Sequence, residues 1–259
     1  MHAVQGDPTP PGPILKTEAV GRFYGNFVAV ADVSFALTVG EIKALIGPNG
    51  AGKTTLFNMM SGQMPPSSGR ILYKGQDITG FPANVLAHLG IGRSFQVTSV
   101  FRKLSVLQNV EIAVQARRHP RLDVFSSASR LEHVRNRAEE ILALVGLSRF
   151  LAQQAGSLSH GDQRRLEIGI VLATDPELIL LDEPTAGMSR EDSAEFALLL
   201  PKLAKDKTVL FVEHNIDFVM NNAQRIVVME RGRILLEGTP AEIRASEEVR
   251  RVYLGSLHD

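Results

Sequence analysis

The sequence predicts an α/β fold in which a core of alternating strands and helices is interrupted by a helical insertion. The hydrophobic pattern carries this prediction, and the chain length agrees with it. Short apolar strands alternate with helical patterns before residue 96 and after residue 157, whereas the segment between them has helical periodicity. The chain has 259 residues, of which 44% are hydrophobic, which suffices for one large domain or for one domain with an additional lobe.

Three regions follow from this pattern. Residues 1–13 are rich in Pro and Gly and lack periodicity, so we expect a disordered tail without the charged start and apolar core of a signal peptide. Residues 14–96 and 157–259 form the predicted α/β core, and the β-rich run "GRILYKGQDI" of its first part is typical of a strand on a surface sheet. Residues 97–156 form the predicted helical subdomain.

The first part of the core contains a strand, a glycine loop and a helix in direct succession. The strand is "EIKALIGPNG", and the helix "TTLFNMMSG" that follows it ends at Gly62. In the middle of the chain, "RLEHVRNRAEEILALVGL" spaces its apolar residues three or four apart, which indicates an amphipathic helix. These apolar residues are Leu131, Val134, Ala138, Ile141, Leu142 and Val145.

The second part of the core resumes the alternation of helices and strands. The expected order is helix 162–174, strand "ELILLDEP", helix 190–204, strand "TVLFVEH", helix 215–222 and strand "RIVVMERGRIL".

Composition excludes several classes of function. Lys plus Arg and Asp plus Glu number 28 each, so the zero net charge argues against a strongly basic surface, and we expect no nucleic-acid partner. Cysteine is absent, which excludes disulfides and cysteine metal sites and suits the cytosol. No apolar run approaches the roughly 18 residues that a membrane-spanning helix needs, so we expect any membrane contact to go through a partner or a surface.

The segment "GPNGAGKT" fits the pattern Gly-x-x-x-x-Gly-Lys-Thr of a phosphate-binding P-loop. Its glycines allow backbone N–H groups to turn inward around phosphates, while Lys53 reaches the β and γ oxygens and the Thr54 hydroxyl can bind Mg²⁺. We therefore predict that the chain binds a nucleoside triphosphate. The predicted binding residues here are Gly47, Pro48, Asn49, Gly50, Ala51, Gly52, Lys53, Thr54 and Thr55.

The segment "LILLDEP" supplies two acidic residues at the end of a buried strand. Asp182 is expected to hold Mg²⁺, as P-loop enzymes require. Glu183 follows at the mouth of the same site and is the natural candidate for positioning or deprotonating the attacking water. Adjacent acids at a strand end are often solvated turn residues, but the P-loop upstream favours the catalytic interpretation.

Three further residues acquire meaning from this context. Gln96 follows the short strand "GIGRSF" and is a candidate to touch Mg²⁺ or the lytic water, although a plain surface glutamine is the simpler reading. His214 ends the strand "TVLFVEH", where a lone histidine is usually a structural residue. Tyr24 lies in "RFYGNFVAV" and is a candidate to stack on adenine, with core packing as the alternative.

The stretch "LSHGDQRRLEIG" begins like a capped helix, since Ser159 and Asp162 form the Ser-x-x-acid pattern of a capping box. A helix N-terminus also attracts anions.

Tyr24, the P-loop, Gln96, "LSHGDQ", "LILLDEP" and His214 follow one another in an order and spacing that resemble the ATP-binding cassette (ABC) ATPases, over essentially all of the chain after residue 13. The resemblance implies a P-loop NTPase (RecA-like) core with an antiparallel β subdomain and an inserted α-helical subdomain. It also implies that the chain uses ATP and Mg²⁺. It assigns adenine stacking to Tyr24, nucleotide-to-transporter linkage to Gln96, the catalytic base to Glu183 and the γ-phosphate switch to His214.

The resemblance also implies that Ser159 and Gly161 meet the γ-phosphate of a neighbouring subunit. His160 and Asp162 depart from the usual glycine and glutamine, and the acid usual in the D-loop is missing from "AGMS", residues 186–189. The charge of Asp162 would repel ATP, so the capping pattern predicts that its side chain turns back onto the N-terminal backbone of its own helix.

The segments "GPNGAGKTTLFNMMSG", "GRSFQ", "LEIG", "DEPTAGM" and "EEVRRVYLG" are similar to ATPases of branched-chain amino-acid-type uptake systems, which include urea and amide importers. The resemblance implies a second, identical or paralogous cassette, membrane permease subunits and, indirectly, an extracellular or periplasmic solute-binding protein. It places the chain at the cytoplasmic face of the inner membrane. The lipopolysaccharide-export ATPase and a non-transport ABC ATPase are the alternatives. A G protein is excluded because the sequence has no guanine-reading motif. A P-loop kinase is excluded because it would not explain "LSHGDQ", Glu183 and His214.

Overall fold

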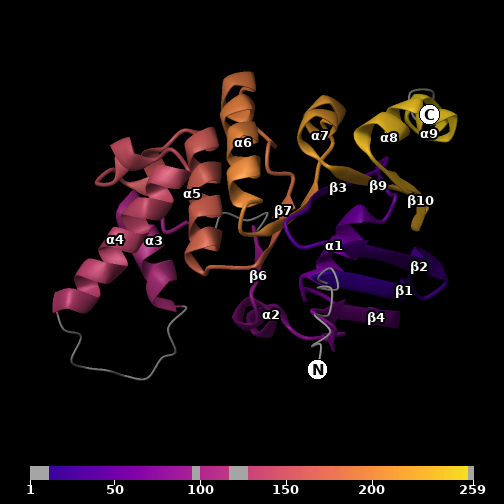
Figure 1. Cartoon of the computed structure of the whole chain (residues 1–259), viewed down its shortest axis with the longest axis horizontal. Coiled ribbons are helices and arrows are strands. Elements are labelled where there is room, and N and C mark those ends of the chain that lie inside the picture. Colours follow the sequence, from indigo (N-terminus) through magenta and orange to yellow (C-terminus); the bar gives the residue numbers. More distant parts are fainter. Residues whose placement is uncertain (1–11, 95–99, 117–127, 256–259) are drawn as a thin grey trace, which may run out of the picture.

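The structure, a computed structural model, describes residues 12–94, 100–116 and 128–255. Its helices and strands form an elongated arrangement in which a small sheet and a helical lobe lie on either side of a central sheet (Figure 1). Residues 1–11 of the predicted tail and Gln96 lie outside the described residues.

The smaller sheet is antiparallel and has four strands in the order β2-β1-β4-β5. These strands are β1 (Leu15–Tyr24), β2 (Phe27–Leu37), β4 (Ser68–Tyr73) and β5 (Gln76–Asp77). The sheet agrees with the antiparallel β subdomain that the resemblance implies.

The central sheet has six strands in the order β10-β9-β3-β8-β7-β6. Its pairs are parallel except for the antiparallel hairpin of β9 and β10, and this confirms the predicted α/β class. The strands are β3 (Ile42–Ile46), β6 (Ile91–Arg93), β7 (Leu178–Asp182), β8 (Thr208–Val212), β9 (Arg225–Glu230) and β10 (Arg233–Gly238).

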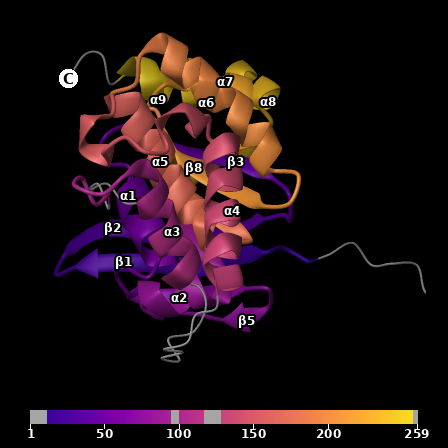
Figure 2. The same ribbon diagram turned by 90° about the vertical axis from the view of Figure 1, so that its left-hand side faces the viewer.

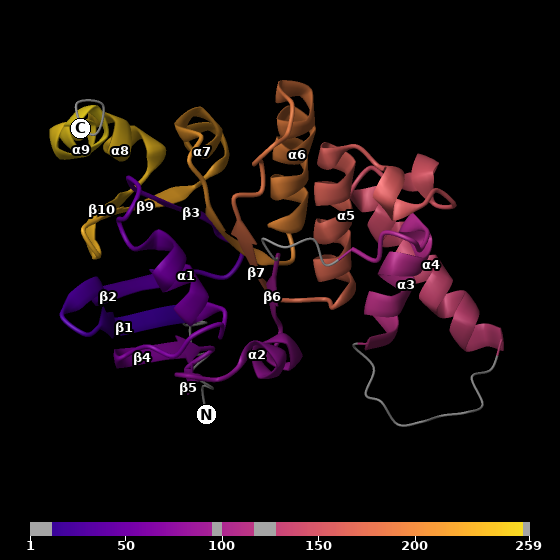
Figure 3. The same cartoon turned by 180° about the vertical axis from the view of Figure 1, so that it is seen from behind.

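Helices cover the central sheet and build the lobe beside it. In Figures 1 and 3, α3 (Val106–Ala116) and α4 (Ala128–Leu144) pack beside α5 (His160–Ala173), far from the four-stranded sheet. Figure 2 views the molecule from this end, with α3 and α4 toward the reader. The remaining helices are α1 (Lys53–Met60), α2 (Ala83–Leu89), α6 (Arg190–Leu203), α7 (Ile216–Asn222), α8 (Pro240–Ala245) and α9 (Glu247–Gly255), with short 3₁₀ turns at Ser148–Phe150 and Ala155–Ser157.

The hydrophobic core is divided between the two faces of the central sheet. Along β3, Ile42, Ala44 and Ile46 belong to a cluster that extends into the helical lobe, whereas Leu45 belongs to a cluster shared with α1 and the four-stranded sheet. This alternation is expected of a central strand that is covered on both faces.

Two elements differ in detail from the prediction. The apolar stripe of α4 is buried as expected, but Leu131 at its start is 57% exposed, because the stripe begins to pack only from Val134. The predicted strand "RIVVMERGRIL" is a hairpin, since Arg231 and Gly232 both adopt positive φ (48° and 79°) and reverse the chain between β9 and β10.

Candidate functional site

The loop after β3 turns sharply into α1 and surrounds its own lysine. The Nζ atom of Lys53 donates hydrogen bonds to the carbonyl oxygens of Gly47 (2.7 Å) and Pro48 (3.0 Å). Burial lowers the pKa of the Lys53 ammonium, while the Glu183 carboxylate opposes that shift. Thr54 is exposed and Thr55 half-buried in the first turn of α1, so hydroxyls and backbone N–H groups of this turn are open to a ligand.

Two glycines of this loop lie against neighbouring backbone. A Cβ atom on Gly47 would lie 2.3 Å from the Met229 carbonyl oxygen, and one on Gly52 would lie 2.5 Å from the Ala29 carbonyl oxygen. Gly47, Gly50 and Gly52 also adopt positive φ (153°, 78° and 95°). The loop therefore requires glycine at these places for conformation and, at Gly47 and Gly52, for space.

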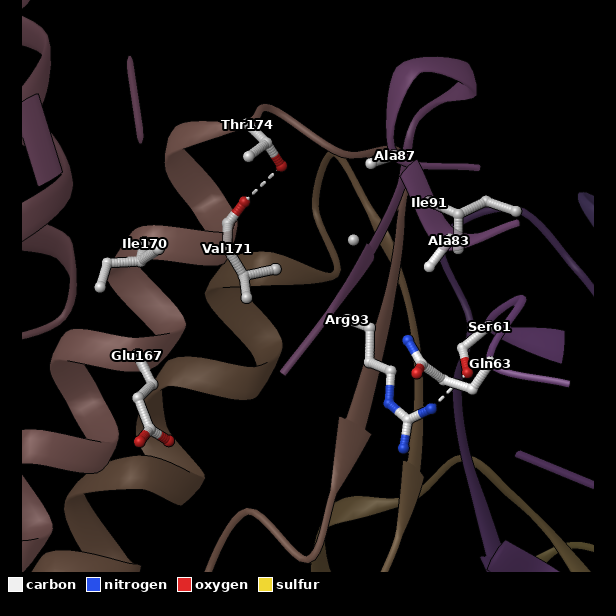
Figure 4. A pocket seen from close by; sticks show the side chains of 11 residues that line it. Ser61, Gln63, Ala83, Ala87, Ile91, Arg93, Glu167, Ile170, Val171 and Thr174 are labelled. Carbon is white, nitrogen blue, oxygen red and sulfur yellow. Dashed lines mark hydrogen bonds between the residues drawn. The ribbon is translucent and has the colours of Figure 1, made fainter. Parts of the chain in front are cut away.

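Asp182 ends β7 and is 1% exposed. Burial raises the pKa of its carboxyl group, and the Arg93 guanidinium, whose Nη2 lies 3.1 Å from Asp182 Oδ2, opposes this shift. Arg93 also donates to the Ser61 hydroxyl, as Figure 4 shows, and its guanidinium carbon lies 4.9 Å from the centre of the Phe57 ring. Asp182 is thus a buried carboxylate with a fixed cationic partner.

Arg93 also lines a small, largely apolar pocket between α1, α2 and β6 on one side and α5 on the other (Figure 4). Its volume is about 140 Å³. Glu167 of α5 lies on the opposite wall and forms an ion pair with Arg164 at 2.6 Å. Arg164 donates to the main-chain carbonyls of Asp182 and Glu183, so both charged residues of the pocket wall connect to the end of β7.

Glu183 has a backbone conformation that is rare for a residue with a side chain. Its φ is 46°, in the left-handed region, and its side chain is 34% exposed. His214 Nε2 lies 3.0 Å from Glu183 Oε1, so the structure brings together the predicted base and the predicted switch. Both side chains are partly exposed, and Glu183 lines, together with Asp182, an opening of about 510 Å³ that extends toward the start of α5.

The start of α5 confirms that Ser159 is a helix cap. Its hydroxyl accepts a hydrogen bond from the Asp162 backbone N–H (3.1 Å) and donates one to Asp162 Oδ2 (2.8 Å). Asp162 is 7% exposed, and its other oxygen lies 3.8 Å from Arg165 Nη2. The carboxylate turns back toward its own helix as expected, but it meets the Ser159 hydroxyl rather than the backbone N–H groups of the predicted capping box.

The packing around Gly161 leaves no room for a side chain. A Cβ atom there would lie 2.6 Å from Asp192 of α6, whose carboxylate also pairs with Arg165 at 2.8 Å. Ser159 and His160 are exposed at the same helix end.

These contacts allow a prediction for the start of α5. Asp162→Gln keeps an oxygen that can accept from Ser159 and removes a charge that is already turned away, so we expect ATPase activity within about twofold of the parent. Ser159→Arg removes the cap, which typically costs about 1 kcal/mol. It also adds bulk to the exposed surface that the resemblance places against the γ-phosphate of a neighbouring subunit. We therefore expect it to abolish cooperative hydrolysis while nucleotide binding persists. Activity and nucleotide affinity of the assembled complex test both; normal ATPase activity of Ser159→Arg contradicts the expectation.

Tyr24 is the remaining predicted residue of the site. Tyr24 ends β1 and is 45% exposed, with the Arg22 guanidinium 4.9 Å from its ring centre, so core packing does not account for it. The ring leaves surface open to a planar ligand.

Sequence reasoning missed Arg93 and Arg164. Arg93 stands in "GRSF" directly before the quoted Gln96, and Arg164 follows the signature stretch, so both lay within motifs that we read for other residues. A buried arginine next to a strand end indicates that a carboxylate partner is present, but only the fold shows which carboxylate it is.

The Arg93–Asp182 pair yields a prediction for stability. Arg93→Met leaves Asp182 buried without its cation, which we expect to lower the free energy of unfolding by about 3 kcal/mol. The double variant Arg93→Met with Asp182→Asn removes both charges and should recover much of that loss. Denaturant unfolding without nucleotide measures both; equal stability of Arg93→Met and the parent contradicts the expectation.

The strand–loop–helix around Lys53, with a buried aspartate at the end of a parallel strand that lies one strand further along the same sheet, defines a P-loop NTPase. The family model for the ABC transporter matches residues 30–186, and a model for the branched-chain amino acid ATP-binding cassette transporter matches residues 233–259. The chain belongs to the ABC transporter family of ATP-binding proteins, and it is an ATPase.

Among curated relatives, the high-affinity branched-chain amino acid transport ATP-binding protein LivG of Escherichia coli (strain K12) is 37% identical over 254 residues, covering 94% of this chain and 98% of LivG. The lipopolysaccharide export system ATP-binding protein LptB of Acidithiobacillus ferridurans is 36% identical over 243 residues, covering 93% and 97%.

Solved structures agree with this assignment. The ADP conformation of an ATP-binding cassette of an ABC transporter superposes with a TM-score of 0.83 at 31% identity, covering 94% of this chain and 99% of that one. A dimeric post-hydrolysis cassette bound to ADP and Pi superposes with a TM-score of 0.74 at 28% identity, covering 87% and 98%.

Proposed function

We propose that this chain is the ATP-hydrolysing subunit of an importer for branched-chain amino acids or related small polar solutes, acting with separate permease subunits. The observation that carries the proposal is the match of residues 233–259 to the branched-chain amino acid cassette model, because it lies outside the general ATPase motifs. The similarity to LivG over 94% of the chain supports it.

In this proposal, ATP binds over the loop after β3. Backbone N–H groups of this loop and of the first turn of α1 hold the phosphates, and Lys53 exchanges its bonds to the Gly47 and Pro48 carbonyls for phosphate oxygens. The half-exposed Tyr24 ring packs against the adenine.

The donor set fits Mg²⁺. Thr54 offers a hydroxyl and Asp182 a carboxylate, with Gln96 as a further proposed ligand, and Mg²⁺ in such sites takes one or two protein oxygens together with substrate phosphates and water. The described residues contain no group of three or more His, Cys, Asp or Glu that could hold a metal ion. When bound, Mg²⁺ neutralises charge on the β and γ phosphate oxygens.

Hydrolysis is assigned to the Glu183–His214 pair. Glu183 is exposed enough to reach a water molecule and orients or deprotonates it for attack on the γ-phosphate. His214, in contact with the same carboxylate oxygen, holds Glu183 in place and contacts the γ-phosphate. Loss of the γ-phosphate after hydrolysis removes these contacts and permits a switch of conformation.

A second cassette completes the site. Ser159 is exposed and Gly161 is buried behind it at the N-terminus of α5, whose positive dipole end favours a γ-phosphate bound by the other subunit. The dimeric relative bound to ADP and Pi supports this arrangement. ATP then closes the pair, and hydrolysis releases it.

The movement is proposed to pass to the permeases through the helical lobe and through the Gln96 region, which follows β6 in the sequence and lies outside the described residues. None of the helices among the described residues is long and apolar enough to cross a bilayer. The similarity to LivG supports the proposal that the chain works peripherally, at the cytoplasmic face of the inner membrane, and communicates with a solute-binding protein through the permeases.

Co-purification with its membrane partners, followed by ATPase measurement in liposomes, tests this function. Stimulation by a binding protein loaded with leucine, urea or a short-chain amide supports import and identifies the solute. Stimulation by lipopolysaccharide with the corresponding membrane partners supports the alternative that the 36% identity to LptB favours. Failure to associate with any permease supports a non-transport ATPase and contradicts both.

A further inference from the structure

Glu213 is a buried carboxylate directly after β8 that the proposed mechanism does not use. It is 4% exposed, whereas the side chain of the adjacent His214 is 47% exposed. A buried carboxylate is costly unless hydrogen bonds satisfy it, so its partners indicate what it does.

The two oxygens of Glu213 bind two different loops. Oε1 accepts from the Thr185 backbone N–H (2.8 Å) and from the Thr185 hydroxyl (2.5 Å), in the loop after β7. Oε2 accepts from the backbone N–H groups of His214 (3.0 Å) and Asn215 (3.4 Å), in the loop after β8. A carboxylate has about four acceptor positions, so these donors occupy it fully and leave no lone pair for a proton-transfer role.

The first of these loops holds Glu183 in its left-handed conformation. Such a conformation persists only where the surroundings fix it from several sides. The Glu183 N–H donates to the Val212 carbonyl (2.9 Å), Arg164 donates to the Glu183 carbonyl (3.2 Å), and Thr185, two residues later, is bound by Glu213.

The distance between Glu183 and His214 depends on how the two loops sit against each other. Their side chains meet at 3.0 Å, one on each loop. Glu213 is the side chain that joins the Thr185 backbone to the His214 backbone.

We propose that Glu213 is a positioning residue that holds the catalytic Glu183 and the switch His214 at their working separation by binding both loops. The inference rests on the proposed roles of Glu183 and His214. It assigns Glu213 no contact with nucleotide.

The primary test is Glu213→Gln in the full chain assembled with its partners. The amide keeps the size of the side chain, but whichever way it turns, its NH₂ group faces N–H donors of one loop. We expect kcat to fall at least about tenfold while the KM for ATP changes less than about twofold, because the phosphate-binding loop comes from other elements. Unchanged kcat overturns the proposal.

Matched variants separate positioning from general destabilisation. Thr185→Val removes the hydroxyl bond to Glu213 and should lower kcat, whereas Thr185→Ser retains that bond and should restore most of it. Thr17→Val removes a fully buried hydroxyl that accepts from the Phe35 N–H (3.0 Å) in the four-stranded sheet, so it should lose stability without losing kcat. An equal loss of kcat in Thr17→Val overturns the proposal.

A double variant shows whether Glu213 acts through Glu183. In a Glu183→Gln background, Glu213→Gln should cause no further loss of kcat; multiplied losses overturn the proposal.

Amide hydrogen exchange is independent of the assignment of the base. Glu213→Gln should accelerate exchange at Thr185, His214 and Asn215 by at least about tenfold, and unchanged exchange refutes the structural link itself. If Glu183→Gln keeps near-normal turnover while this exchange accelerates, the base assignment fails and the link between the loops stands.

Discussion

Glu183→Gln is expected to bind MgATP with nearly parental affinity and to hydrolyse it roughly 10²–10⁴-fold more slowly, the range that general acid–base catalysis contributes. The amide keeps the shape of the side chain and can still meet His214, but it cannot accept a proton from water. The phosphate-binding loop is untouched, which is why binding should persist. Single-turnover hydrolysis and equilibrium nucleotide binding in the assembled complex measure the two effects separately.

Glu177→Gln provides the control for Glu183→Gln. Glu177 precedes the same strand, and its side chain is 55% exposed in a surface pair with Lys74, so its replacement should leave turnover unchanged. Near-normal turnover of Glu183→Gln would remove Glu183 from the role of base.

Gly47→Ala is expected to weaken ATP binding by at least about tenfold and to lower the free energy of unfolding by about 2–4 kcal/mol. The added methyl group would lie 2.3 Å from the Met229 carbonyl oxygen, which belongs to the backbone of β9 and cannot rotate away. This clash can therefore be relieved only if the loop leaves the position in which Lys53 and the backbone N–H groups of the loop face the ligand. Thermal unfolding and nucleotide titration of the purified chain check both effects.

Gly50→Ala is the matched control within the same loop. Gly50 also has positive φ (78°), but a Cβ atom there would meet nothing within 4 Å. We expect it to lose about 1 kcal/mol from backbone strain alone and to keep the loop in place. Equal effects of the two alanine variants would show that space around Gly47 is not the cause.

The sequence predicted the parts of the site that local patterns define. The P-loop depends on glycines and a lysine at fixed spacing, and Asp182 and Glu183 depend on an apolar strand that ends in acids, so neighbouring residues suffice to recognise them. Ser159 was recognisable as a cap for the same reason, since its partner Asp162 lies three residues away.

The contacts that join distant segments could not be read in this way. Arg93 and Asp182 are 89 residues apart and meet because β6 and β7 are neighbours in the sheet. Thr185 and Glu213 are separated by 28 residues and meet because β7 and β8 are neighbours. The order of strands decides both pairs, and the periodicity of a single strand does not contain that order.

The central position of β3 determines how the molecule can open. The strand has partners on both edges, β8 and β9, and buried clusters on both faces, so its backbone can be released only when the core as a whole unfolds. Partial unfolding that loosens the ends of the molecule leaves this strand intact. The proposed phosphate-binding loop therefore starts from the segment whose opening costs the full stability of the fold, and we expect nucleotide binding to survive fluctuations that reach the periphery.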